Sequence, residues 1–477
     1  MPSSKIFHCA AVDLGATSGR VLVGTWNGKR LLLKEIHRFS NKFRSLNGHD
    51  YVDLPGLWAE ITSGLRTARK QFPKLASVGV DTWGVDHVLV NDSGRLVFPA
   101  HAYRDNRTRP GLERLARTRA VLERIYAATG IPNVFYNSSL QLEETVACCP
   151  GVEDTATRCL FLPDYFNYLL SGRMENEISI ASTTQLLDVR DADWSRPTLD
   201  YFRIPYTWFT KPILAGTVLG PVRDLPELKG VTAVAVPGHD TACAYAAMPT
   251  KPGGGDLFIS SGTWSLVGFE SDHPVLGPKA LKSRISNERC GDGHYRPLTN
   301  VIGLWLLEQT LKDLSARPKN SREWKKLIND SGRLPAPAHL LDVEDPAFIN
   351  PPSMRLAIDA QLKKRRLPVP RNVAGYTRLI CDSLGQAHAD ALRVFERLVG
   401  RKFDRILVVG GGSKNRMVCQ ATADASGLPV HAFTLEGSAV GNIASQLVAL
   451  RAVRSLASFR ELFARQLSPT IYLARPK

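Results

Sequence analysis

The chain has 477 residues, of which 44% are hydrophobic and 22% are charged. Both fractions are close to the averages of globular proteins, and they exclude a wholly disordered chain. At roughly 150 residues per domain, the length predicts two or three domains whose cores need neither disulfides nor metals for stability.

The formal net charge of +16 would attract anions such as nucleotides or nucleic acids. A surface that is simply rich in arginine is the simpler explanation of this charge. The compact basic run at 363–366 lacks the interleaved aromatic residues that single-stranded nucleic-acid sites use. We therefore expect no nucleic-acid partner.

The eight cysteines are scattered along the chain and form no Cys-x-x-Cys pair, so neither a disulfide framework nor a zinc ribbon is expected. Residues 1–12 lack the apolar core of a signal peptide, and no apolar stretch approaches the 18 residues of a membrane span. These observations predict a cytoplasmic protein with no membrane partner.

The first half of the chain alternates predicted strands and helices, which is typical of an α/β protein. Small residues at 14–19 predict a turn, and Asn27-Gly28 is typical of a two-residue type I′ hairpin. Hydrophobic spacing predicts strands at 6–13, 20–26, 30–39, 76–80 and 231–236, and helices at 54–72, 111–128, 159–171 and 242–247.

The second half repeats this design after a Gly- and Pro-rich segment at 251–255, which we interpret as a linker. Strands are predicted at 256–260, 264–269 and 406–409, with a small-residue turn at 261–263, a helix at 375–399 and a glycine turn at 410–413. The repetition predicts two similar α/β lobes, and ligands tend to bind in the cleft between such lobes.

The sequence lacks several common nucleotide and hydrolase motifs. It contains no GxxxxGK[ST], no GxGxxG after a strand, no GxSxG and no HExxH. These absences argue against P-loop NTPases, Rossmann dehydrogenases, α/β-hydrolases and zincin proteases. A nucleotide site would have to use other turns.

Two small-residue turns have the composition of a phosphate site. Asp13 precedes the turn that ends at Arg20, and Ser261-Gly262-Thr263 offers a second group of backbone amides and hydroxyls. Such turns bind phosphate oxygens, and a carboxylate beside them can hold Mg²⁺ through water. Two ordinary hairpin turns would have the same composition.

The glycines at 410–412 follow an apolar strand and would allow a nucleotide to approach the backbone closely, although a tight strand-to-helix turn explains them equally well.

Asp240 stands between an apolar strand and a helix of small residues. It is a candidate general base that takes the proton of a hydroxyl group as its oxygen attacks phosphorus. A helix N-cap is the alternative role, because Asp is favoured at that position. If Asp240 is the base, the Trp83 ring could pack against a bound polyol as an aromatic wall, and Gly84 would let the polyol come close to the backbone. Trp83 fits a position in the hydrophobic core equally well.

Taken together, these motifs resemble the FGGY carbohydrate kinases of the actin/hexokinase-like ATPase superfamily, over nearly the whole chain. The resemblance rests on Ala-Val-Asp-Leu-Gly at 11–15, Asp-Thr-Trp-Gly-Val-Asp at 81–86, His-Asp-Thr at 239–241, Ser-Ser-Gly-Thr-Trp-Ser-Leu at 260–266 and Val-Gly-Gly-Gly at 409–412. It implies two ribonuclease-H-like domains flanking an interdomain cleft. The implied boundaries are 1–248 for a sugar-binding domain, 255–450 for a nucleotide-binding domain and 451–477 for an extension.

The strings at 81–86 and 260–266 are particular to members that act on L-rhamnulose. The resemblance therefore implies ATP-dependent phosphorylation of the 1-hydroxyl of L-rhamnulose, in L-rhamnose catabolism. The partners would be a ketose and MgATP, and we expect a monomer with a dimer left open. Matching motifs assign Asp240 as the catalytic base, Gly84, His239, Asp240, Thr241 and Asn300 as sugar contacts, Ala16, Thr17, Ser18, Gly19, Arg20, Thr263, Glu308 and Gly411 as ATP contacts, and Asp13 as the Mg²⁺ residue. Trp83 is a further candidate sugar contact, as an aromatic wall.

One residue departs from the family pattern. Where the family commonly has a glutamine that reaches ATP, this chain has Glu308, whose carboxylate would repel phosphates unless it is protonated or linked to Mg²⁺. Two alternatives stay open from the sequence. The chain could act on another ketose (L-fuculose, L-ribulose or D-xylulose), or it could be a non-catalytic regulator that binds ATP or sugar.

Overall fold

The computed structural model describes residues 5–250 and 254–476. Contacts group the chain into two compact units. The first comprises Met1–Pro249, Ser271–Pro297 and Glu436–Gln466, and the second comprises Thr250–Glu270, Leu298–Leu435 and Leu467–Lys477. Of the predicted linker at 251–255, residues 251–253 lie outside the described part. The predicted domains 1–248, 255–450 and 451–477 are consecutive stretches of chain, whereas each of these units collects three separate segments. The predicted boundaries stay a prediction.

The first unit is built on a six-stranded mixed sheet with the order β3-β2-β1-β6-β10-β9. β1 pairs antiparallel with β2 and parallel with β6, so β1 and β6 end at the same edge of the sheet. The six strands are β1 (Phe7–Leu14), β2 (Ser18–Trp26), β3 (Leu31–Ser40), β6 (Leu75–Thr82), β9 (Val218–Pro221) and β10 (Thr232–Val234).

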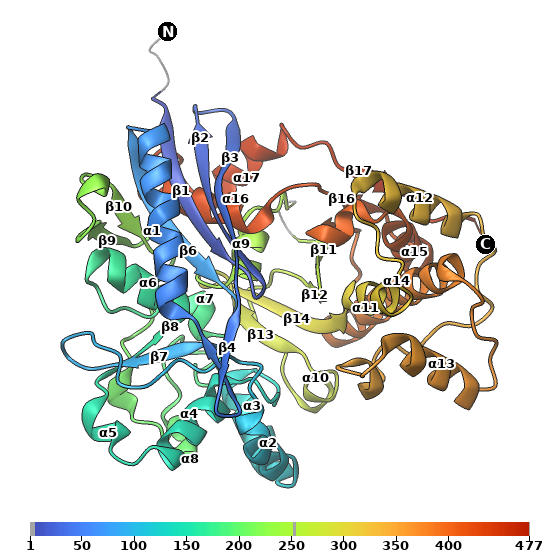
Figure 1. The fold of residues 1–477 in the computed structure, drawn as a ribbon, viewed down its shortest axis with the longest axis horizontal. Coiled ribbons are helices and arrows are strands. Elements are labelled where there is room, and N and C mark those ends of the chain that lie inside the picture. The colour runs from blue at the N-terminus through green and yellow to red at the C-terminus, as the bar shows by residue number, and fades with distance from the viewer. Residues whose placement is uncertain (1–4, 251–253, 477) are drawn as a thin grey trace. The chain divides into compact units, whose positions relative to one another are not determined.

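Helices cover both faces of this sheet (Figure 1). A side chain on Gly64 of α1 (Leu54–Gln71) would meet Val21 of β2, and a side chain on Gly24 of β2 would meet Ile443 of α16 (Gly437–Ala449). Residues 21 and 24 of one strand point to opposite faces, because side chains alternate along a strand. α1 and α16 therefore pack on opposite faces, although more than 360 residues separate them in the chain.

The rest of the first unit is mainly helical, and it encloses a second apolar core that includes Phe161, Trp194 and Trp208. Its remaining strands are β4 (Phe43–Leu46), β5 (His49–Val52), β7 (His87–Val90), β8 (Arg158–Phe161) and β13 (Ser286–Arg289). Its remaining helices are α2 (Arg109–Ala116), α3 (Arg119–Thr129), α4 (Ser138–Cys148), α5 (Val152–Thr155), α6 (Leu162–Ser171), α7 (Ile178–Ala181), α8 (Arg196–Phe202), α9 (Asp240–Ala246), α10 (Pro278–Lys282) and α17 (Leu456–Ala464).

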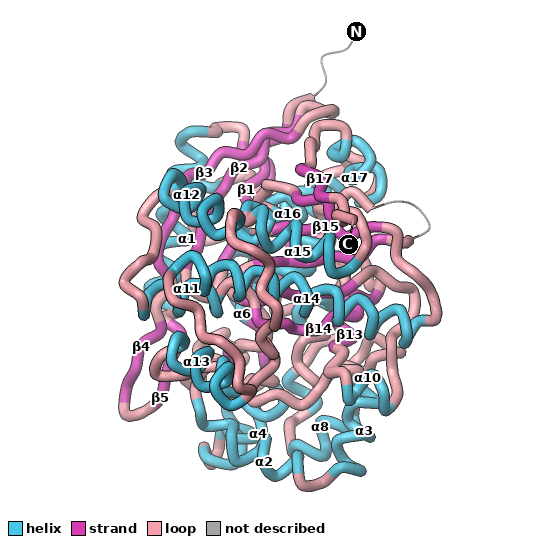
Figure 2. The backbone as a smooth tube through the Cα atoms, turned by 90° about the vertical axis from the view of Figure 1, so that its right-hand side faces the viewer, coloured by secondary structure: helices cyan, strands magenta, loops and turns pink. Residues whose placement is uncertain are grey.

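The second sheet of the molecule has the order β13-β14-β12-β11-β15-β16-β17. Beside its strands in the second unit, α14 and α15 lie side by side (Figure 2), and Gly385 of α14 lets the backbone at Ala421 of α15 come close. The elements are β11 (Asp256–Ser261), β12 (Trp264–Gly268), β14 (Tyr295–Ile302), β15 (Arg405–Val409), β16 (Val430–Ala432), β17 (Thr470–Tyr472), α11 (Trp305–Asp313), α12 (Ser321–Gly332), α13 (Met354–Lys364), α14 (Val373–Val399) and α15 (Arg416–Ser426).

Three local predictions are wrong. The helix expected at 111–128 is two helices, α2 and α3, separated by two residues. The helix expected at 159–171 begins as β8 and becomes α6 only at Leu162, because residues 158–161 pair with β7. The hairpin at Asn27 has a four-residue connection rather than a two-residue type I′ turn, and the Asn27 side chain accepts hydrogen bonds from the amides of Lys29 and Arg30.

No helix in the described part of the chain is long and apolar enough to cross a membrane. The eight cysteines all lie in the described part, and each is a free thiol there.

Candidate active site

Two carboxylates stand at one edge of the first sheet. Asp13 lies at the end of β1 and Asp81 at the end of β6, and the two are register partners in the parallel ladder. Both residues are buried, Asp81 completely. The apolar residues before them form the strands, and the shared direction of the strands brings the two acids together.

The Asp13 carboxylate is held by side chains from two distant segments. Arg20 of β2 donates to its Oδ2 atom over 2.6 Å, and Ser438 of α16 donates to the same atom over 2.7 Å. Arg20 also donates to Glu436, immediately before α16. The predicted ATP contact Arg20 and the predicted Mg²⁺ residue Asp13 are therefore brought together, and Arg20 is ion-paired on both sides.

Asp81 has an incomplete set of hydrogen bonds. Asn442 of α16 donates to its Oδ2 atom over 2.7 Å, whereas Oδ1 is buried with no hydrogen-bond partner among the described residues. Burial, reinforced by the charge of Asp13, raises the pKa of Asp81 well above its ordinary value. A cation near this edge of the sheet would be stabilised by the two acids.

The first predicted phosphate turn joins β1 to β2. The Gly15 amide donates to the Ser18 carbonyl over 2.9 Å, and the side chain of Asn41 donates to the Gly15 carbonyl over 3.0 Å. Thr17 is exposed at the tip, with Ala16 and Ser18 partly exposed beside it. Gly19 differs from these residues, because a Cβ there would lie 2.3 Å from the Phe39 ring. Packing inside the first unit therefore explains why residue 19 is a glycine, without any contact to ATP.

Asp240 begins α9, next to the carboxyl end of β6. The Thr82 amide donates to the Gly238 carbonyl over 2.8 Å, and Glu177 accepts from the Gly238 amide over 2.8 Å. These two bonds fix the backbone that leads into His239 and Asp240. A third of the Asp240 side chain stays exposed, so a ligand can reach it.

The Asp240 carboxylate has polar neighbours on several sides. Thr241 donates to its Oδ1 atom over 3.0 Å, and Nε2 of His239 lies 3.4 Å from the same atom. Burial raises the pKa of Asp240 above its ordinary value, the charge of Asp13 adds to this rise, and hydrogen bonds from Thr241 oppose it. A carboxylate with a raised pKa is a stronger base, which suits proton removal.

Gly84 and Trp83 have different surroundings. A Cβ on Gly84 would lie 3.5 Å from Nε2 of His239, so this predicted sugar contact faces the predicted base region. Trp83 is only 5% exposed, packs in the sheet core, and donates its indole N–H to Asp86 over 2.8 Å. The core position that the sequence left open as an alternative for Trp83 is the one that the structure has.

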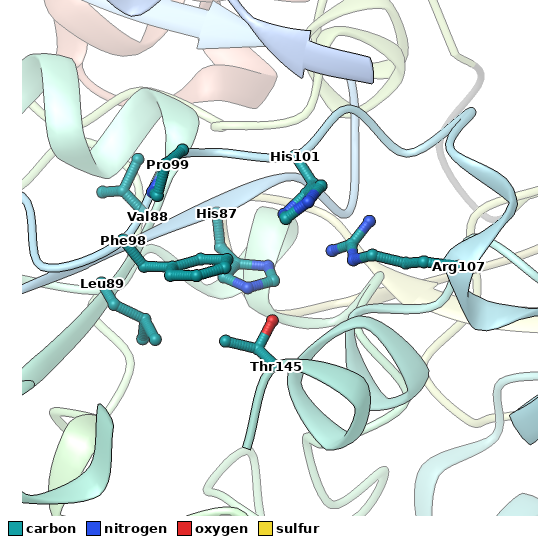
Figure 3. Close-up of a pocket in the computed structure, with 8 residues that line it drawn as sticks. All are labelled: His87, Val88, Leu89, Phe98, Pro99, His101, Arg107 and Thr145. Carbon is teal, nitrogen blue, oxygen red and sulfur yellow. The ribbon is translucent and has the colours of Figure 1, made fainter. Parts of the chain in front are cut away.

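A small pocket lies beyond the Trp83–Asp86 turn (Figure 3), and it contains none of the predicted site residues. The Arg107 guanidinium and the Thr145 hydroxyl point toward the rings of His87 and His101. Burial lowers the pKa of His87 to about 3 and that of His101 to about 4, so both rings are neutral at physiological pH.

The second predicted phosphate turn, at 261–263, is well supported inside the second unit. The Gly303 amide donates to the Thr263 carbonyl over 3.1 Å, and the Leu304 amide donates to the Gly262 carbonyl over 2.9 Å. A Cβ on Gly303 would lie 2.7 Å from both of those carbonyl oxygens. Gly303 and Leu304 therefore hold the turn in place, and Thr263 is exposed at its tip.

The glycine turn at 410–412 packs against the same turn. A Cβ on Gly412 would lie 2.0 Å from Oγ of Ser261, and one on Gly410 would lie 2.5 Å from the Ser261 carbonyl. Gly411 lies between them and is exposed, and a Cβ there would meet no described atom within 4 Å. The structure thus brings Thr263 and Gly411, the predicted ATP contacts, to neighbouring turns.

Asn300 and Glu308 also belong to the second unit. Asn300 lies on β14 opposite Leu266 of β12, and it is exposed. The other predicted sugar contacts all belong to the first unit. Glu308, in the first turn of α11, is 3.4 Å from Arg317, which offsets part of its charge.

No cluster of three or more His, Cys, Asp or Glu side chains in the described ranges is arranged to hold a metal ion. Asp13 and Asp81 offer fewer ligand oxygens than Mg²⁺ requires. The two acids therefore suit a cation whose remaining ligands come with a nucleotide.

Two family models match the chain in sequence order. Residues 9–246 match the N-terminal domain of the FGGY family of carbohydrate kinases, and residues 257–450 match its C-terminal domain. The chain belongs to the FGGY family of carbohydrate kinases. It is an ATP-dependent sugar kinase, as the resemblance implies.

Individual relatives agree with the family. A rhamnulokinase from Klebsiella pneumoniae is 38% identical over 474 residues, which cover 99% of this chain and 96% of that protein. A xylulose kinase structure from Rhodospirillum rubrum matches with a TM-score of 0.79 at 17% identity, over 99% of this chain and 95% of its own. A Plasmodium falciparum glycerol kinase with ADP matches with a TM-score of 0.78 at 12% identity, over 98% and 94%. The predicted two-domain α/β fold of the actin and hexokinase type is confirmed.

Sequence reasoning missed several residues of this FGGY kinase site. Asp81 could have been found, because it ends an apolar strand parallel to the one that ends at Asp13. Ser438 and Asn442 of α16 had no such signal, since nothing near them in the sequence shows that this helix packs against β1 and β6. The buried Glu288 and Arg296, which contact His239, were likewise not identified.

Proposed function

We propose that the chain transfers the γ-phosphoryl group of MgATP to the 1-hydroxyl of L-rhamnulose, with Asp240 as the general base. The observation that supports this substrate is the 38% identity to the Klebsiella rhamnulokinase, which extends over 99% of the chain. The eight free thiols suit a reducing compartment, and the proposal places the reaction in the cytoplasm.

The surroundings of Asp240 support its role as the base. Its carboxylate is partly exposed, its pKa is raised, and its backbone is fixed by Thr82 and Glu177 on either side of Gly238. In the reaction, Asp240 takes the proton of the sugar hydroxyl while that oxygen bonds to the γ-phosphorus, and the bond from phosphorus to ADP breaks. Protonated Asp240 then releases the proton to water.

The remaining predicted residues bind and orient the two substrates. Positioning and charge stabilisation provide most of the rate in phosphoryl transfer, and the Mg²⁺ of the nucleotide neutralises the charge on the phosphates. In the proposal Asp13 helps to place that ion, the turns at 16–20 and 263 and the backbone at Gly411 bind ATP, and Glu308 lies near it. Sugar contacts are proposed at Gly84, His239, Thr241 and Asn300, whereas Trp83 belongs to the hydrophobic core.

A second candidate function is a kinase of another ketose. Xylulose kinases are among the solved structures with this fold, at a TM-score of 0.79. The chemistry of Asp240 would be the same, because the stereochemistry of the middle carbons affects only the residues that bind the sugar.

A substrate panel separates these candidates. ADP release by the purified protein with MgATP would be measured for L-rhamnulose, L-fuculose, L-ribulose, D-xylulose and glycerol. The proposal requires the highest kcat/KM with L-rhamnulose. A preference for another sugar would support the mechanism but refute L-rhamnulose as the substrate. If no sugar gave ADP release, the proposed kinase activity would be refuted.

Asp240→Asn tests the base. We expect kcat to fall by roughly 10²–10⁴-fold, the usual value of one acid–base group. Asp272→Asn makes the same chemical change at a side chain that is 82% exposed, and it should leave kcat unchanged. Because the pKa of Asp240 is raised, wild-type activity should decline with falling pH sooner than an ordinary aspartate would allow. A folded Asp240→Asn variant with full turnover would show that another group accepts the proton.

A further inference from the structure

His239 is held on one side by a buried ion pair. Its Nδ1 atom lies 2.7 Å from Nη2 of Arg296 and 3.1 Å from Oε2 of Glu288. Glu288 comes from β13 and Arg296 from the start of β14, and both belong to the first unit, with His239. The segment Ser271–Pro297 therefore returns from the second half of the chain to contact a predicted sugar-binding residue.

The ion pair has little freedom to move. The Arg296 side chain is completely buried, its Nη2 atom lies 2.5 Å from Oε2 of Glu288, and its Nε atom donates to the Arg289 carbonyl over 2.9 Å. Ser286 donates to the other oxygen of Glu288 over 3.2 Å. Both groups are thus fixed by bonds that do not involve His239.

These contacts determine where the imidazole carries its proton. A guanidinium group only donates hydrogen bonds, so at 2.7 Å from Arg296 the Nδ1 atom must accept one. A proton on Nδ1 would point at an N–H of Arg296, even though Glu288 could accept it. A neutral ring with its single proton on Nε2 satisfies the contact between Nδ1 and Arg296.

The Nε2 atom faces the predicted sugar-binding side. It lies 3.4 Å from Oδ1 of Asp240 and 3.5 Å from the place that a Cβ on Gly84 would occupy. Since Gly84 has no side chain, a hydroxyl group of a ligand can approach this N–H.

We propose that Glu288 and Arg296 are positioning residues that fix His239 as an Nε2–H donor to a sugar oxygen. This proposal rests on the proposed function, because it takes a ketose as the ligand. The Nε2–H of His239 then donates a hydrogen bond to a sugar oxygen, so this nitrogen cannot accept the proton of the sugar hydroxyl. Asp240 is left as the proton acceptor. The ion pair in this way separates the group that recognises the sugar from the group that reacts.

The position of the proton can be measured without any substrate. The full-length protein would be labelled with ¹⁵N in its histidine rings, and the His239 signals would be assigned by their loss in His239→Gln. We expect a protonated Nε2 and an unprotonated Nδ1 at pH 7.5. A ring protonated on Nδ1, alone or together with Nε2, would overturn the proposal.

Variants of the ion pair identify the contact that fixes the tautomer. In Arg296→Met the donor is gone, so Glu288 should accept from Nδ1–H and the proton should move to Nδ1. Arg296→Lys keeps a donor, and Glu288→Gln keeps Arg296, so both should retain the wild-type tautomer. If Arg296→Met does not fold, these two variants still decide, because a proton on Nδ1 in either would overturn the assignment.

Kinetics tests the link to the sugar. We expect Arg296→Met to raise the KM for the ketose about tenfold, the value of one lost hydrogen bond, with little change in kcat. Arg296→Lys should restore most of this loss. An equal loss in both variants, or a loss confined to kcat, would show a structural role only. If no ketose is turned over, the proposed function fails while the ring measurement still tests the tautomer.

Discussion

Replacing Gly411 by alanine would show whether a nucleotide approaches this turn. An added Cβ meets no described atom within 4 Å, and Gly411 does not have a left-handed φ, so the folded chain can accept the methyl group. The free energy of unfolding should change by less than about 0.5 kcal/mol, as for an ordinary surface substitution. If ATP packs on this backbone, the methyl group should cost about 1–3 kcal/mol of binding, which raises the KM for ATP roughly 5–150-fold.

The adjacent Gly412 is the matched control. The same methyl group there would lie 2.0 Å from Oγ of Ser261, so it should destabilise the fold by about 1–3 kcal/mol. Thermal unfolding and steady-state kinetics at saturating sugar would be measured for both variants. An unchanged KM for ATP in a stable Gly411→Ala variant would refute nucleotide binding at Gly411.

Two further predictions concern the first unit. Gly441→Ala would place a methyl group 1.8 Å from the Cys243 carbonyl, between α16 and α9. The free energy of unfolding, measured by thermal unfolding, should therefore fall by ~1–3 kcal/mol or more. Burial raises the pKa of Asp86 to about 7, so ionisation opposes folding, and stability should fall as pH rises from about 4 to 7. Asp86→Asn should make this decline shallower, measured as urea midpoints across that pH range, while other buried acids such as Asp81 keep the rest. An unchanged decline would show that Asp86 does not contribute to it.

Local sequence patterns predicted five strands of the first sheet and three of the second, most of them as apolar runs. They missed strands that are short or contain polar residues, namely β9, β13, β14, β16 and β17. The same patterns could not separate strand from helix at 159–171, where an apolar run continues through both β8 and α6. Pro163 was the available signal, since proline is favoured in the first turn of a helix and not within a strand pair. The pairing of β8 with β7, which lies about 70 residues earlier, decided the outcome.

The site could be predicted in part, for a related reason. Asp13 stands at a strand end, and Asp240 directly follows a strand and its loop, so residues near each of them in the sequence indicate its place. Glu288 and Ser438 lie far from both in the chain, and only the folded structure brings them to His239 and Asp13. Buried contacts of this kind depend on tertiary packing, which spacing along one segment does not record.

The packing of α16 on β1 also has a consequence for the order of synthesis. Gln446 donates to the Ala10 carbonyl over 2.9 Å and accepts from Ser77 over 2.6 Å, so it bridges strands made some 370 residues and more before it. A nascent chain that stops before α16 leaves these groups unbonded and one face of the first sheet uncovered. The first sheet to be translated is therefore among the last to be completed, and until then its bare face is a surface for chaperones to bind.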